Sequence, residues 1–464
     1  GNTFSGSAYA GVGPEWAQDS NYSDELKAAG LQAATPLIKN YDYSGAVGGP
    51  IRKDRLWFFT SARTQGNSQY VSNIFHNKNA GNPSAWTYSP DTTRQAFRDR
   101  TWDNANIRLT SQITPRNKLN IFWDEQRTCR ECENGGNNWG HSPEANSQGQ
   151  QPIIVKQGTW TSTVSNKVLL EFGGSEYHAR WGGWKAKEDP YTADMIRMIQ
   201  QCTAGCAVNG GIPGLIYRSQ SNDLFVSGRN LNHIIMWRGS FSYVTGAHSF
   251  KAGYVANRLS DLRLANRAPN GLDYRVNNGV PNQLTMWINN YQNDVYMRGD
   301  GYYAQEQWTR KRLTLQGAIR YDRAWSWAPE QTEGPVQFLP TPISFPKTEI
   351  ANAFNDITPR MAATYDLFGD GKTALKATLG KYLEAALTSG TYVRGNPTSR
   401  IIQSVNRAWT DANGNFRADC NLLDGTAQDL RASGGDFCGA FSNRNFGTTT
   451  FTNTIDPDIL KGWG

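Results

Sequence analysis

The chain has 464 residues, a formal net charge of +7 and only 38% hydrophobic residues, which is too few for one large dry core. Disorder does not explain this polarity, because aromatic residues make up 12% and include 16 Trp and 20 Tyr, whereas disordered chains are poor in aromatics. The basic residues are spread along the chain without a run of five like charges, so we expect no nucleic-acid partner.

Six tight polar turns recur along the chain, and each joins two segments whose apolar residues fall mostly on alternate positions. These turns are at 53–55, 114–117, 165–167, 246–248, 309–312 and 369–372. Short turns on one side and long polar loops on the other are typical of an antiparallel barrel in a bacterial outer membrane. The predicted fold class is therefore all-β, an up-and-down transmembrane β-barrel with short periplasmic turns and long extracellular loops.

The alternating segments predict about thirteen strands. In chain order they are 3–11, 40–50, 55–65, 102–113, 118–128, 153–164, 167–181, 233–245, 248–262, 293–308, 312–325, 357–367 and 372–384. Most of them reach the roughly 9–11 residues that a tilted strand needs to cross a membrane.

The strands are expected to have one apolar and one polar face. After the turn at 309–312, for example, Leu313, Leu315 and Ile319 alternate with Gln316 and Arg320. A charged face on strand after strand does not fit the dry interior of a β-sandwich, but it fits a wet lumen with the apolar face towards lipid. The polar residues that we expect to line the lumen are Arg108, Gln112, Gln316, Arg320, Asp322, Arg360 and Asp366.

Long loops connect the predicted hairpins and are the expected ligand-contact surface, because loops of this length usually have a function. They are expected at 12–39, 66–101, 129–152, 182–232, 263–292, 326–356 and 385–464, of which 182–232 and 385–464 are the largest outer loops. Three short helices are predicted within them, at 23–34, 192–201 and 423–432. Loop tryptophans such as Trp86, Trp139, Trp184 and Trp325 are expected either to stack on a ligand or to anchor the protein at the membrane interface.

The six cysteines form three close pairs, all within the predicted loops. They are Cys129 and Cys132, Cys202 and Cys206, and Cys420 and Cys438. Disulfides suit an oxidising compartment, and pairs this close would staple the loop tips. A zinc site is the alternative for Cys129 and Cys132, although no second ligand pair lies nearby.

The segment 411–420 is the sharpest local signal for a metal. Oxygen-bearing side chains occupy its first, third, fifth and ninth positions, namely Asp411, Asn413, Asn415 and Asp419, which resembles the calcium loops of thrombospondin type 3 repeats. An EF-hand is excluded, because Phe416 stands where that motif needs glycine. The alternative is an Asx-rich turn closed by a disulfide. A structural calcium ion is the one cofactor that the sequence suggests.

No enzyme constellation is present in the sequence. The five histidines do not form a His-Glu-x-x-His pattern, and neither a Gly-x-Ser-x-Gly elbow nor a phosphate-binding glycine loop occurs. We therefore expect the protein not to be an enzyme.

The segment 48–59, Gly-Gly-Pro-Ile-Arg-Lys-Asp-Arg-Leu-Trp-Phe-Phe, resembles the Oar-like subfamily of TonB-dependent outer-membrane receptors. The segments 313–322, 357–360, 369–382 and 456–464 resemble later parts of the same receptors, in the expected order. The resemblance implies a plugged barrel of 22 strands. The plug, the TonB-contacting segment and the closing strands have no counterpart in the sequence, so 1–464 is expected to be a partial barrel domain.

The resemblance also implies a function in the bacterial outer membrane. It implies active uptake of a scarce extracellular ligand (an iron chelate, a peptide, a protein or a glycan), which the outer loops bind and the polar lumen passes inward. The implied partners are the outer-membrane lipid, that ligand and the inner-membrane TonB complex, which would act through a plug. The alternative is a secreted or surface all-β binding or adhesion protein without transport.

Overall fold

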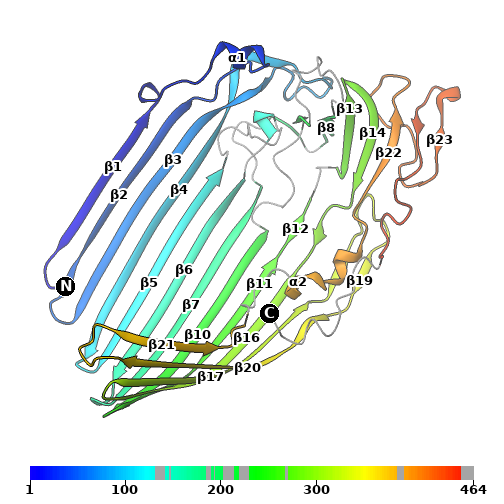
Figure 1. The fold of residues 1–464 in the computed structure, drawn as a ribbon. Coiled ribbons are helices and arrows are strands. Elements are labelled where there is room, and N and C mark those ends of the chain that lie inside the picture. Colours follow the sequence, from blue (N-terminus) through cyan, green and yellow to red (C-terminus); the bar gives the residue numbers. More distant parts are fainter. Residues whose placement is uncertain are drawn as a thin grey trace.

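The computed structural model describes residues 1–130, 142–145, 148–183, 190–192, 194–201, 214–218, 229–266, 270–383 and 391–450. Its main body is a curved wall of thirteen antiparallel strands, each paired with the next in chain order within this sheet (Figure 1). The strands are β1 (Ser5–Pro14), β2 (Leu37–Arg52), β3 (Leu56–Asn77), β4 (Pro90–Thr114), β5 (Asn117–Arg130), β6 (Gln148–Thr163), β7 (Val168–Gly183), β10 (Asn230–Thr245), β11 (His248–Leu262), β16 (Val295–Arg310), β17 (Leu313–Ala328), β20 (Thr348–Asp366) and β21 (Ala374–Gly380). All thirteen predicted strands are confirmed.

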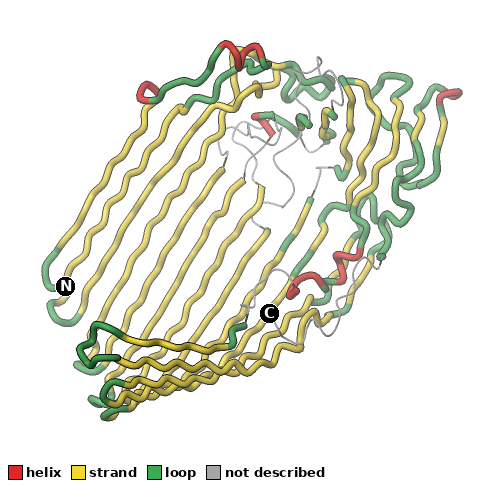
Figure 2. Tube along the Cα trace, viewed as in Figure 1, coloured by secondary structure: helices red, strands yellow, loops and turns green. Residues whose placement is uncertain are grey.

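The tight turns gather at one end of this sheet, and the long connections gather at the other (Figure 2). Positive φ values favour tight hairpins, and Asp54, Gly246, Lys311 and Gly369 have them in four of the six turns. The strands β3 and β4 are longer than predicted, at 22 and 25 residues, so much of the expected loop 66–101 continues the sheet instead.

The strand register sorts the side chains of the sheet into two faces. Residues that pair directly across neighbouring antiparallel strands share a face. One continuous row across nine strands consists of Gln112, Lys118, Thr161, Glu171, Ser240, Gly253, Tyr303, Arg320 and Thr358. We call the face that carries this row the polar face.

A row on the opposite face contains no charged residue. It consists of Leu119, Trp160, Phe172, Gly239, Tyr254, Tyr302, Tyr321 and Ile357. Large side chains on this apolar face are exposed; Phe172 is 56% exposed, Ile319 54% and Met361 53%. Such a face suits contact with lipid, and the strands thus have one apolar and one polar face, as the alternation predicts.

Three of the long connections contain strands, which form a second sheet of seven strands at the outer end. Its order is β23 (Gln428–Asp429), β24 (Phe437–Cys438), β22 (Ser404–Thr410), β14 (Val280–Trp287), β13 (Leu272–Asn277), β8 (Arg197–Gln200) and β9 (Ile216–Tyr217). These strands come from three separate connections, those after β7, β11 and β21. We call this structure the outer sheet.

The outer sheet has a hydrophobic core of its own. Met198, Leu284 and Met286 are fully buried there, together with Tyr274 and Trp409. Trp86, from the turn between β3 and β4, packs on this core; its ring stacks on Phe416 with 5.0 Å between centroids. The expected segments 182–232 and 385–464 are thus folded in their described parts.

The helix predictions for the outer segments are only partly right. The helix α1 (Asp24–Ala28) lies within the predicted 23–34, with Ser23 as its N-cap. The prediction for 192–201 is wrong, because Arg197–Gln200 form β8, which pairs in parallel with β13 and buries Met198. The prediction for 423–432 is wrong as well. No helix in the described part of the chain is long and apolar enough to span a membrane.

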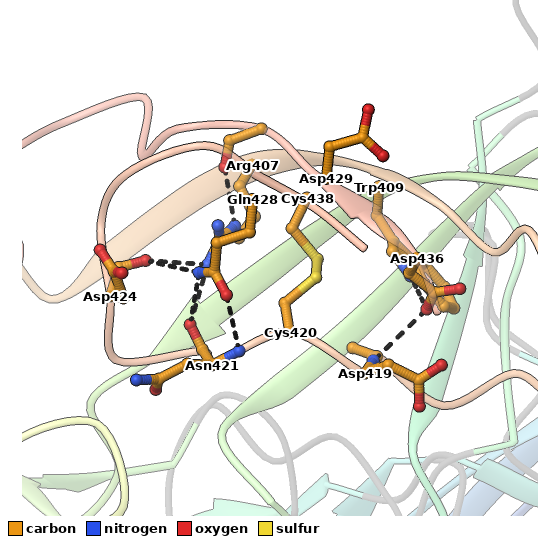
Figure 3. Close-up of a disulfide and its surroundings, with 12 residues drawn as sticks. Arg407, Trp409, Asp419, Cys420, Asn421, Asp424, Gln428, Asp429, Asp436 and Cys438 are labelled. Atoms are coloured by element: carbon orange, nitrogen blue, oxygen red, sulfur yellow. Dashed lines mark hydrogen bonds between the residues drawn. A yellow bond between two sulfur atoms is a disulfide. The ribbon is translucent and has the colours of Figure 1, made fainter. Parts of the chain in front are cut away.

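The buried side chain of Arg407 is bonded to the segment 423–432, which is not an α-helix. Its guanidinium donates to the backbone carbonyls of Asp424 at 3.2 Å, Thr426 at 3.0 Å and Gly439 at 2.9 Å (Figure 3). The segment instead forms β23 followed by a short 3₁₀ turn, Arg431–Ser433.

Candidate functional site

The polar face carries a hollow of about 970 Å³ near the outer end of β1–β7. Its lining includes the side chains of Tyr9, Asp42, Arg100, Trp102, Gln126 and Tyr177. Aromatic faces beside amides and single charges of both signs can hold a mixed polar and apolar ligand, and the volume is that of a small-molecule site. We call this region the outer hollow.

The strands hold the outer hollow rigidly. Arg63 of β3 donates to both carboxylate oxygens of Asp42 on β2, at 2.8 and 2.6 Å. Asn104 of β4 donates to Asp124 of β5 at 2.6 Å, and Gln126 donates to the other oxygen of Asp124 at 2.7 Å. These bonds orient two of the lining residues, Asp42 and Gln126, without a ligand.

A second, smaller hollow of about 310 Å³ lies on the polar face of β11, β16, β17 and β20. Three cations, Lys251, Arg320 and Arg360, line it. Lys251 pairs with Glu171 at 2.8 Å, and Arg320 pairs with Asp322 at 2.7 Å. The surface that a solute meets here is therefore rich in partly neutralised positive groups.

The register places all seven residues predicted for the lumen on the polar face. Arg320 and Arg360 share the smaller hollow, and Gln316 donates to Gln307 at 2.7 Å. Two of the seven also hold turns: Gln112 donates to the carbonyl of Thr114 at 2.8 Å, and Asp366 accepts the backbone N–H groups of Gly369 and Gly371. Arg108 lies over the ring of Phe122 at 5.2 Å. Their role as lumen walls stays a prediction.

The sequence interpretation missed the residues of the outer hollow. Tyr9, Asp42 and Trp102 all lie in segments that were predicted as strands, but their faces were not assigned. The sequence holds one clue to the face of β1, since Tyr9, Gly11 and Gly13 alternate with the apolar residues Ala8, Ala10 and Val12. Only the register across seven strands brings these residues together.

The predicted disulfide between Cys420 and Cys438 is confirmed, with 6.4 Å between the Cα atoms (Figure 3). It closes a loop that begins beside Asp419 and ends in β24. Cys129 is also disulfide-bonded, so the zinc alternative for it is wrong. Cys132, Cys202 and Cys206 lie outside the described residues, as do Trp139 and Trp184.

The segment predicted to bind calcium folds as a series of tight turns. The side-chain oxygens of Asp411 and Asn413 converge on the same group, the backbone N–H of Asn415, each at 3.1 Å. Asn413 Nδ2 donates to Asp419 at 2.7 Å, and Asn415 Oδ1 accepts the backbone N–H of Arg417. The oxygens of Asp411, Asn413 and Asn415 thus all accept backbone N–H groups, as in an Asx-rich turn, and the calcium site stays a prediction.

The loop that joins β17 to β20 contains a buried carboxyl group, Glu333. Glu333 is 1% exposed, and both its oxygens accept the backbone N–H of Gln292 at 3.1 Å. It belongs to β18 (Gln331–Glu333), which pairs with β19 (Ile343–Phe345). Burial raises the pKa of the Glu333 carboxyl to about 7, and the nearby Asp294 carboxylate adds to the rise.

This loop is expected to lose stability as the pH rises. The folded form keeps the Glu333 proton up to a pKa of about 7, whereas an unfolded glutamate releases it near 4.5, so the stability falls between these two pH values. Hydrogen exchange of 331–345, corrected for intrinsic rates, should be faster at pH 8 than at pH 5. Glu333→Gln should remove most of this difference; a difference that persists in that variant would assign it to another group.

The family comparison agrees with this architecture. Residues 63–462 match the family model described as "Outer membrane beta barrel domain". Among solved structures, the chain is similar to the outer membrane transporter YddB from Escherichia coli, with a TM-score of 0.49 and 10% identity over 81% of this chain and 44% of that one. It is similar to the siderophore receptor PiuA from Acinetobacter baumannii, with a TM-score of 0.44 and 8% identity over 80% and 52%.

The ferripyoverdine receptor of the outer membrane of Pseudomonas aeruginosa is also similar, with a TM-score of 0.47 and 10% identity over 88% of this chain and 46% of that one. The chain thus spans about half the length of these three proteins. Among curated protein sequences, none matches.

Proposed function

The chain belongs to the outer membrane beta barrel domain family and lies in the bacterial outer membrane, and from this premise we propose that it takes part in the active uptake of an extracellular ligand. The outer hollow is the observation that carries the proposal, because it is a ligand-sized site on the water-facing side of the sheet. The smaller hollow, which is lined by Lys251, Arg320 and Arg360 on the same face, would receive the ligand next.

We further propose that the protein is a TonB-dependent receptor of the Oar-like subfamily. The resemblance of 48–59 and 313–322 supports this assignment. In the structure the first segment spans the turn from β2 to β3, and the second lies within β17. Uptake by such a receptor requires the energised inner membrane, which gives the proposal a direct test.

The test measures binding and uptake separately in cells that make the protein. Radiolabelled probes of three classes are used: a ferric chelate, a tetrapeptide and an oligosaccharide. Uptake of at least one probe should stop when an uncoupler collapses the proton gradient, while surface binding remains. Trp102→Ala should weaken that binding about tenfold, since an aromatic contact contributes on the order of 1 kcal/mol beyond the area that it buries. Trp123→Ala, on the apolar face, is the matched control and should leave binding unchanged.

Two outcomes would contradict the proposal in different ways. Binding without gradient-dependent uptake would favour the alternative of a surface binding or adhesion protein, which the separately folded outer sheet supports. Neither binding nor uptake of any probe would remove the outer hollow as a ligand site.

We also propose that a calcium ion orders the segment 411–420, because oxygen-bearing side chains occupy its first, third, fifth and ninth positions. Limited proteolysis between Asp411 and Cys438 should then be slower with millimolar calcium than with EGTA. Asp411→Ala should abolish the difference, because it removes the only carboxylate among the first three oxygen ligands. Equal cleavage of the unmodified protein in both conditions would leave the segment as an Asx-rich turn.

A further inference from the structure

The apolar face changes character towards its outer end. One row there runs across seven strands and consists of Trp123, Lys156, Glu176, Ile235, Arg258, Arg298 and Trp325. We call it the rim row. Its cations lie over tryptophan rings: Lys156 is 5.2 Å from the centroid of Trp123, and Arg298 is 5.0 Å from that of Trp325. Tryptophans beside charged residues are typical of the boundary between membrane and water.

A cluster of potential metal ligands lies at this boundary. Glu176 and His178 are two residues apart on β7, and His233 of β10 pairs directly with His178. One ligand atom of each residue lies within 4.8 Å of the ligand atoms of the other two. Among the described residues this is the only such group of three or more His, Cys, Asp or Glu.

The sheet geometry explains why these three side chains converge. Residues two apart on a strand point to the same face, and directly paired residues on neighbouring strands have Cβ atoms about 4.5–5.5 Å apart. His233 Nε2 lies 3.1 Å from Glu176 Oε1, and the two imidazole rings are 5.7 Å apart and nearly perpendicular. Ligand atoms on a tetrahedral zinc ion would be about 3.4 Å apart, so small side-chain rotations suffice.

The surroundings leave the cluster accessible and only partly neutralised. Glu176 is 32% exposed and His233 30%, so an ion can reach them from outside. Lys156 Nζ contacts the second carboxylate oxygen of Glu176 at 3.0 Å and leaves the first to His233. The ammonium group stabilises the carboxylate when no ion is bound, and it opposes a second cation beside it.

We propose that Glu176, His178 and His233 bind a divalent first-row transition-metal ion, with Zn²⁺ as the representative. Two imidazoles and a carboxylate are ligands that such ions accept, whereas Ca²⁺ and Mg²⁺ require oxygen. Three protein ligands leave a coordination position for water. This site is independent of the ligand taken up on the polar face, since it lies on the other side of the sheet.

The test titrates Zn²⁺ into the membrane-extracted protein in detergent by calorimetry, with Ca²⁺ present throughout. The unmodified protein should bind one Zn²⁺ more than His178→Ala and His233→Ala do, or bind it at least about tenfold more tightly. Co²⁺ should give a ligand-field absorption that the same two variants lose. Lys156→Gln should tighten binding, because it removes the opposing charge.

His248→Ala is the matched control. His248 contacts Glu306 at 2.9 Å on the same face near the turn end, but this pair belongs to no three-ligand group within the described residues. Its Zn²⁺ titration should equal that of the unmodified protein. Heat-modifiable gel mobility verifies folding, and Glu176→Gln, which keeps the side-chain shape, replaces any alanine variant that fails this check. Absence of Zn²⁺ binding, or equal binding by all variants, would show that the cluster is only a hydrogen-bonded network.

Discussion

Asp273→Ala is expected to unfold the outer sheet while the thirteen-stranded sheet stays intact. Asp273 is fully buried, and its carboxylate receives Arg197 Nε at 2.6 Å and Nη2 at 2.8 Å. Trp287 Nε1 donates to it at 2.7 Å. Removing one partner of a buried ion pair typically costs about 3–5 kcal/mol. Arg197 lies in β8 and Asp273 in β13, so the loss falls on the parallel pairing that joins two outer segments.

Limited proteolysis and gel mobility measure the two parts separately. Cleavage in 270–290 should become rapid, whereas the heat-modifiable mobility of the barrel should persist. Asp429→Ala is the control: its ion pair with Arg431 is equally short, at 2.6 Å, but about half exposed, so cleavage should not change. The double variant Arg197→Met, Asp273→Leu should recover most of the protection, since an apolar pair leaves no charge unpaired. Protection unchanged in Asp273→Ala would mean that the pair does not stabilise the outer sheet.

Trp409→Ala is expected to have a similar effect by another route. Trp409 is 1% exposed in the core of the outer sheet, where its ring lies 4.5 Å from that of Tyr274. Truncating a buried tryptophan usually costs about 3–5 kcal/mol through lost burial and the cavity that remains. The substitution also removes the indole donor at 2.9 Å from the buried carboxylate of Asp436 (Figure 3).

Hydrogen exchange of β14 and β22 measures this loss, because these strands pair directly in the outer sheet. Their amides should exchange faster in Trp409→Ala by roughly 100-fold or more, which corresponds to about 3 kcal/mol of local stability. Trp16→Ala provides the control, since Trp16 is 86% exposed beside β1. Slow exchange of β22 in Trp409→Ala would show that the core tolerates the cavity.

The main sheet was predictable because its signal is local. Several strands of that sheet, such as β17, alternate over enough residues to fix their period, and tight turns such as 369–372 set the pairing of neighbours. The start of β3 is less clear, because Leu56–Phe59 is apolar on both faces. The outer sheet was not predictable for the opposite reason. β9, β23 and β24 have only two residues each, and β8 finds its partner β13 more than 70 residues away.

The candidate sites divide in the same way. Alternation alone assigned Arg320 and Arg360 to the polar face, where they meet in the smaller hollow. The outer hollow forms only because residues from β1 to β7 lie at the same level of the sheet. That level depends on how far each strand is shifted along its neighbour, which alternation does not reveal. Glu176, His178 and His233 were overlooked because no sequence motif joins them; their proximity comes from the register of β7 against β10.

The mixed origin of the outer sheet bears on how these surface segments can change. Its strands come from three connections that leave the main sheet at β7, β11 and β21, yet they share one core. A connection grafted from another outer-membrane barrel would bring its own part of that core and find no matching part. Engineering of this surface, for instance to display a foreign epitope, should therefore exchange the three connections as a set, or confine insertions to turns such as that at Asn278 between β13 and β14.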